Sequence, residues 1–189
     1  HGYKANEHLL EKYGNRVPVR ENEWDNRHFW RVSNAEHLAM SEDCGIVNLS
    51  HFHMTDIEGP DHVALMEWLC AAKIGGDANI GKGIYTHFLD DEGMVRADFT
   101  AFRMADRIRM VNGADAGPRD YHYMRRVAQD KGFDVTITDV AEKFVTIGIW
   151  GPNARVNLAK VVEDPDGLSK ENFPFAAIKP VRIAGKDVS

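Results

Sequence analysis

The chain has 189 residues, of which 43% are hydrophobic and 28% are charged, a composition typical of folded globular domains and unlike that of disordered or collagen-like chains. This length predicts one domain or two small ones and leaves no room in these residues for a large multi-domain enzyme. The formal net charge is −6 with the acidic residues spread along the chain, so we expect no nucleic-acid partner, because phosphate backbones bind basic surfaces. The longest apolar stretches are interrupted by Glu67 and are far shorter than a bilayer span, so we expect no membrane partner.

The N-terminal residues predict an arm. Residues 2–18 are polar and show no helical or strand period, so we expect an arm over 1–22 with no chemistry of its own. The first residues also lack the apolar core of a signal peptide. Cys44 and Cys70 are the only cysteines and form one pair at most, which favours a reducing compartment. We therefore expect a cytoplasmic protein.

The following residues predict a helix and then strands. Apolar and aromatic side chains line one side of a helix over 23–40, which Gly45 terminates. Two short strands follow at 46–49 and 52–57. A second helix begins at Pro60, because proline suits the first helical position.

The middle of the chain predicts a β-hairpin. Strands at 84–89 and 94–104 flank an acidic turn that ends in Gly93, which takes positive φ easily. The further elements expected are a strand, a helix, two strands, a helix and the start of a hairpin, at 108–111, 117–132, 135–140, 144–150, 152–161 and 180–188. This order predicts an α+β fold with a mostly antiparallel sheet and packed helices.

Two motifs suggest ligand sites that their context does not favour. His51 and His53 belong to no Cys/His cluster with the spacing of metal ligands, so we expect no metal. Residues 76–82 have the spacing of a phosphate-binding loop, but the next residue is Gly83 instead of Ser or Thr, and no parallel strand precedes the loop. A surface loop is the favoured interpretation.

Six short segments carry a more specific signal through their common order and spacing. They read IVNLSH, IEGPD, GKGIYT, GMVRAD, MVNG and GIWGP, at 46–51, 57–61, 81–86, 93–98, 110–113 and 148–152. Together they resemble the folate-binding domain of the glycine cleavage T-protein (aminomethyltransferase) family, and the expected order of strands and helices agrees with that resemblance.

Within this family the pattern is more similar to the folate domain at the C-terminal end of dimethylglycine and sarcosine dehydrogenases. The hairpin segment 93–98 and Trp150 carry this similarity. Two positions depart from the T-protein itself. Ala97 replaces the first of two adjacent carboxylates, of which Asp98 remains, and Asn48 stands where the T-protein commonly has Asp.

The resemblance implies transfer of a one-carbon unit from a methylated or aminomethyl nitrogen to tetrahydrofolate, the expected cofactor. A carboxylate near the reacting nitrogen helps by orienting the pterin and stabilising developing positive charge. By the family match, Asp98 is the catalytic carboxylate and a cofactor contact, and Tyr85 and Asn112 lie along the pterin pocket. Thr100 and Trp150 are further expected contacts. For Tyr85, Thr100 and Trp150, ordinary sheet packing is an equal alternative.

The expected partner is a small methylamine-type donor or a donor-bearing protein domain, and the resemblance leaves open a flavin domain elsewhere in the native protein. Family members continue beyond a hairpin like that at 180–188, so we expect 23–189 to be an aminomethyltransferase-like folate-binding domain that is incomplete at its C-terminus. Two alternatives stay open. One is a non-catalytic folate-binding or assembly module of the same fold, and the other is a structural fragment whose apolar face, including Trp24 and Trp30, binds another chain.

Overall fold

The computed structural model describes residues 6–16 and 30–188. They form two compact units. The first, the helical unit, holds the described residues up to Val47 together with Gly148–Val162, and the second, the sheet unit, holds Asn48–Ile147 together with the described residues from Glu163 on. The expected α+β class with an antiparallel sheet is confirmed.

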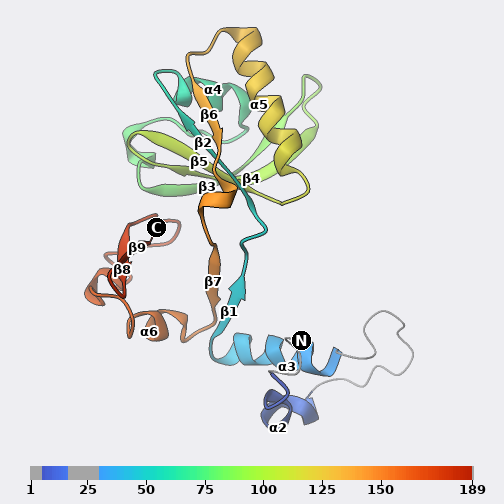
Figure 1. Cartoon of the computed structure of the whole chain (residues 1–189), viewed down its shortest axis with the longest axis vertical. Coiled ribbons are helices and arrows are strands. Elements are labelled where there is room, and N and C mark those ends of the chain that lie inside the picture. The colour runs from blue at the N-terminus through green and yellow to red at the C-terminus, as the bar shows by residue number, and fades with distance from the viewer. Residues whose placement is uncertain (1–5, 17–29, 189) are drawn as a thin grey trace. The chain divides into compact units, whose positions relative to one another are not determined.

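The sheet unit is built on a five-stranded antiparallel sheet with the strand order β3-β4-β5-β2-β6 (Figure 1). Two helices, α4 and α5, pack on one face of this sheet. The main elements are β2 His53–Glu58, α4 His62–Leu69, β3 Lys82–Leu89, β4 Val95–Arg103, β5 Arg107–Asn112, α5 Gly117–Lys131 and β6 Thr136–Asp139. Three 3₁₀ turns, Asp77–Asn79, Ala141–Lys143 and Asp166–Leu168, and a hairpin of β8 Val181–Ile183 and β9 Lys186–Val188 complete the unit.

The core lies between the sheet and the two helices. Successive side chains of a strand point to opposite faces, and those that point toward α4 and α5 are mostly apolar. On β4, Ala97, Phe99 and Ala101 are buried in this core, whereas Asp98 and Thr100 point to the other face. Burial of the apolar side chains therefore fixes which face each polar residue of the hairpin occupies.

The hairpin and α5 lie where the sequence predicts them, because their turn residues specify the chain's path. The Asp90 side chain accepts hydrogen bonds from the backbone N–H groups of Glu92 and Met94, at 3.0 and 2.9 Å, and Gly93 has φ +82°. Helix α5 ends at Lys131, and the next residue, Gly132, is left-handed with φ +74° and caps the last turn.

The helical unit contains three short helices and a two-stranded ribbon of β1 and β7. Their bounds are α2 Leu9–Tyr13, α3 Trp30–Glu42, β1 Gly45–Asn48, β7 Ile147–Trp150 and α6 Ala154–Leu158, with a 3₁₀ turn at Gly14–Arg16. Helix α2 lies within the expected arm, and five helical residues are too few to give a readable period. Trp30 is buried with Tyr13 and does not form an exposed apolar face, and Trp24 lies outside the described residues. Among the described helices, none has the length and apolar character needed to cross a membrane.

Candidate functional site

The open face of the β3–β4 hairpin gathers three of the five residues singled out in the sequence. Tyr85 pairs across the ladder with Thr100, and His87 pairs with Asp98. Residues directly opposite each other in an antiparallel pair share a face, so these four side chains lie together on the face away from α4 and α5. We call them the hairpin face. The structure thus brings Tyr85, Asp98 and Thr100 together.

A hydrogen bond joins two members of the hairpin face. The Tyr85 hydroxyl donates to Asp98 Oδ2 at 3.0 Å, and Tyr85 is 62% exposed. Asp98 accepts this bond and thereby raises the pKa of the Tyr85 hydroxyl, to which slight desolvation and the carboxylate charge also contribute. The phenol therefore stays protonated and remains a donor at neutral pH. The His87 ring meets the Tyr85 ring edge-on, with 5.2 Å between centroids.

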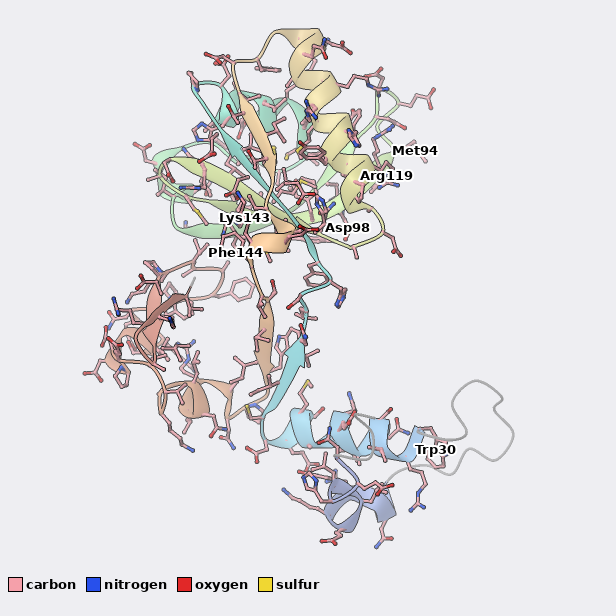
Figure 2. All side chains as sticks on the ribbon, viewed as in Figure 1. Trp30, Met94, Asp98, Arg119, Lys143 and Phe144 are labelled. Carbon is pink, nitrogen blue, oxygen red and sulfur yellow. The ribbon has the colours of Figure 1, made fainter. Side chains whose placement is uncertain are left out.

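The same face continues across β5 and β2 with charges that are already paired. Arg109 donates from Nε and Nη2 to the two carboxylate oxygens of Asp56, at 2.7 and 2.8 Å, and Asp56 is only 3% exposed. The Arg109 guanidinium also lies 4.2 Å from the centroid of the Phe144 ring. Figure 2 labels Asp98 and Phe144 in this unit. By contrast, none of the ion pairs of the described residues involves Asp98, so its carboxylate is left to accept hydrogen bonds from a ligand.

Asn112 occupies a different environment. It lies at the end of β5 with its side chain on the helix-covered face, where it is 4% exposed. Its Nδ2 donates to Oδ2 of the fully buried Asp120 at 2.9 Å, and Arg119 Nε donates to the other oxygen of that carboxylate at the same distance. Asn112 and the hairpin face therefore lie on opposite sides of the sheet. The hydrogen bond from Asn112 to Asp120 connects β5 to α5.

Trp150 belongs to β7 of the helical unit and is partly exposed. Its contact with a pterin therefore stays a prediction. Within residues 6–16 and 30–188, no three His, Cys, Asp or Glu side chains gather in a way that would hold a metal ion. Both cysteines are free thiols, and burial raises the pKa of Cys70 to about 12.

Comparisons with known proteins show the family to which the chain belongs. The model of the GCVT N-terminal domain matches residues 4–189 of the chain. The chain belongs to this family. Among curated relatives, the aminomethyltransferase of Bordetella avium (strain 197N) is 35% identical over 147 residues, which cover 77% of this chain and 40% of the relative. The mitochondrial dimethylglycine dehydrogenase of Rattus norvegicus is 26% identical over 157 residues, which cover 82% of this chain and 18% of the relative.

The fold of this GCVT-family chain is also found among solved structures. The crystal structure of the glycine cleavage system aminomethyltransferase T from Bartonella henselae superposes with a TM-score of 0.62 and 24% identity, over 75% of this chain and 37% of the other. The chain thus spans about two fifths of the length of the aminomethyltransferases it matches.

Sequence reasoning missed His87 and the Asp56–Arg109 pair of this GCVT-family chain. His87 follows Tyr85 by two residues on an expected strand, and that spacing alone puts both on one face. The ion pair had no comparable signal, because Asp56 and Arg109 are far apart in the sequence and meet only through the register of β2 and β5.

Proposed function

We propose that the hairpin face binds tetrahydrofolate and that the protein takes part in the transfer of a one-carbon unit to it. The observation that carries this proposal is the exposed Asp98 carboxylate, held by Tyr85 on the open side of the sheet in a member of the GCVT family. The aminomethyltransferase and dimethylglycine dehydrogenase relatives support this class of reaction. We propose a small methylated amine or a donor-bearing protein domain as the source of the one-carbon unit.

The residues on the hairpin face fit a reduced pterin by their chemistry. A pterin presents N–H donors along one edge and a flat ring, and an ionised carboxylate is an acceptor for such donors. Asp98 Oδ2 accepts from Tyr85, and no donor among the described residues bonds to its other oxygen. The rings of Tyr85 and His87 lie beside the carboxylate and offer a surface for stacking.

Each side chain has a defined task in this proposal. Bound tetrahydrofolate supplies the nitrogen that takes up the one-carbon unit. Asp98 orients the pterin, stabilises positive charge near that nitrogen and accepts a proton from it. Tyr85 holds the carboxylate in place through its hydroxyl, and the raised pKa of that hydroxyl keeps it a donor. Thr100, on the same face, offers a further hydroxyl.

The absence of a second carboxylate at Ala97 does not weaken this assignment. Ala97 is 6% exposed and lies in the core under α4 and α5, so a carboxylate with that orientation would point away from Asp98. The exposed Asp98 carboxylate favours a catalytic role over the alternative of a non-catalytic folate-binding or assembly module.

Calorimetric titration with tetrahydrofolate, combined with single-turnover transfer from an aminomethyl donor, tests the proposal. Asp98→Asn should lower the transfer rate by about 100-fold or more and weaken binding by about tenfold or less, because general acid–base groups act mainly on the chemical step. Asp91→Asn, which removes the same charge in the exposed turn of the same hairpin, is the matched control and should change neither the transfer rate nor the affinity.

Two results would contradict the proposal. If Asp98→Asn lowered the transfer rate and the tetrahydrofolate affinity by the same factor, Asp98 would have a role in binding only. Absence of tetrahydrofolate binding by the wild-type protein would remove the function altogether.

A further inference from the structure

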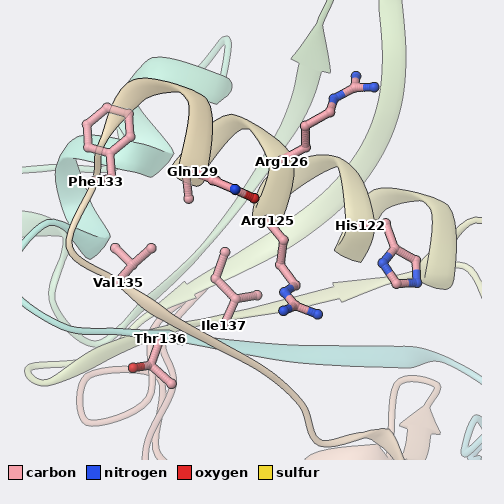
Figure 3. Close-up of a pocket in the computed structure, with 9 residues that line it drawn as sticks. His122, Arg125, Arg126, Gln129, Phe133, Val135, Thr136 and Ile137 are labelled. Carbon is pink, nitrogen blue, oxygen red and sulfur yellow. The ribbon is translucent and has the colours of Figure 1, made fainter.

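A groove lies between α5 and β6, on the helix side of the sheet's edge (Figure 3). It encloses about 580 Å³, within the range of protein binding pockets. Apolar side chains of Phe133, Val135 and Ile137 line it from the strand side, and they are only partly buried against the core. His122, Arg125, Arg126 and Gln129 line it from α5. We call this the α5–β6 groove.

The basic side chains of the groove are available to a ligand. Neither Arg125 nor Arg126 forms an ion pair with a carboxylate among the described residues. The Arg125 guanidinium lies 5.5 Å from the centroid of the Tyr121 ring, which limits its freedom before any ligand arrives. In Figure 3 the Arg125 side chain extends from α5 toward β6 near Ile137. In a protein with a net charge of −6, this groove is a local site for acidic groups.

The strand beside the groove has an open edge. Among the described residues β6 pairs only with β2, and it ends the sheet. The Val140 N–H donates to the Met54 carbonyl at 3.0 Å, so the alternation of an antiparallel ladder turns the N–H and C=O groups of Ile137 and Asp139 outward. The Tyr121 hydroxyl reaches the Ile137 carbonyl only at 3.4 Å, which leaves that oxygen a second acceptor site.

β6 lacks several of the features that commonly protect a sheet edge, although it is only four residues long and ends in Asp139. Natural edges are commonly protected by lysine, proline or a bulge, whereas β6 reads Thr-Ile-Thr-Asp without a register shift. Its residues favour extended structure. A strand placed next to β6 would send every second side chain toward α5, under His122 and Arg125, because Ile137 faces that side.

From these observations we propose that the α5–β6 groove binds an extended acidic segment of another protein, which adds to the sheet as a strand next to β6. Backbone hydrogen bonds to Ile137 and Asp139 supply sequence-independent affinity. Acidic side chains at alternate positions meet Arg125 and His122, and these contacts select the segment. This site is separate from the hairpin face and does not depend on folate binding.

The test uses the whole chain and a blocked heptapeptide, Thr-Glu-Thr-Glu-Thr-Glu-Thr. As the peptide is added, the NMR chemical shifts of the backbone amides of residues 122–139 should change and then reach a plateau. At saturation, exchange of the Ile137 and Asp139 amide hydrogens should slow about tenfold, because strand addition pairs these outward groups. An ion that bound only to the arginine side chains would leave that exchange unchanged.

Charge reversal separates specific docking from general attraction. Arg125→Glu should weaken binding of the glutamate peptide by about tenfold or more, and a peptide with lysine in place of glutamate should bind this variant better than the wild type. Lys131→Glu on the same helix, outside the groove, changes the net charge equally and should weaken binding less than about twofold. Absence of binding, binding without slower exchange at Ile137 and Asp139, or equal effects of the two variants would overturn the proposal.

Discussion

Replacing Asn112 by alanine separates a structural role from a role in ligand binding. The Asn112 amide donates to the fully buried Asp120 carboxylate at 2.9 Å, so Asn112→Ala removes a charge-assisted hydrogen bond from the interior. Such bonds contribute about 1.5–3 kcal/mol, and Arg119 still satisfies the other carboxylate oxygen. The free energy of unfolding should therefore fall by about 2 kcal/mol, which corresponds to a decrease in Tm of roughly 4–8 °C for a chain of this size.

The assay is urea unfolding followed by circular dichroism, with tetrahydrofolate affinity measured on the same samples. Asn153→Ala is a matched control, because Asn153 Nδ2 also donates to an aspartate, Asp43, at 2.9 Å but in an exposed position. It should cost less than about 0.5 kcal/mol. Because Asn112 lies on the helix-covered face, Asn112→Ala should retain tetrahydrofolate affinity within about twofold. Unchanged stability together with a tenfold loss of affinity would refute this reasoning and identify Asn112 as a pterin contact.

Two further substitutions and one measurement of thiol reactivity test packing and burial in the sheet unit. A Cβ at Gly117 would clash with the His53 ring. Gly117→Ala should therefore lower the free energy of unfolding by about 1–3 kcal/mol in urea, and wild-type stability would contradict this close approach. Arg109→Met removes the two-point partner of the buried Asp56 carboxylate and leaves it only Arg107, whose Nη1 lies 3.4 Å from Asp56 Oδ2. The substitution should cost about 2–4 kcal/mol in the free energy of unfolding, most of which Asp56→Leu/Arg109→Met should recover. Absence of that recovery would argue against a poorly compensated buried charge as the cause. Burial raises the pKa of Cys70 to about 12, so the neutral thiol's contribution to stability is complete below about pH 9 and is lost as the pH rises toward 12. At pH 8 the Cys70 thiol should react with a thiol reagent much more slowly than in urea, and equal rates would contradict its burial.

The sequence predicted the elements that are specified by neighbouring residues, without contacts from distant parts of the chain. The hairpin follows from the acidic turn and Gly93, and the end of α5 follows from Gly132, since both glycines adopt a positive φ that other residues disfavour. The expected strand at 144–150 is shorter in the structure, where β7 begins at Ile147. Thr146 instead donates its N–H to the Ser50 hydroxyl, a contact between distant parts of the chain that no local pattern predicts.

The candidate site was predictable only in part, for a similar reason. Tyr85, Asp98 and Thr100 share a face because the hairpin turn fixes the register between their strands. Asn112 continues an alternation in which Ile108 and Met110 point into the core, so the strand period alone places its side chain on the buried face. The pterin contact that the family resemblance implies for Asn112 stays a prediction.

The most direct test of the hairpin face is a tetrahydrofolate titration of the ¹⁵N-labelled protein, followed by backbone amide shifts. Binding at the hairpin face predicts saturable changes centred on residues 85–87 and 98–100, with little change along α5. Asp98→Asn should reduce these changes at a given ligand concentration, whereas Asp91→Asn should not. Saturable changes confined to α5 or to the helical unit, with none on β3 and β4, would contradict the proposed site.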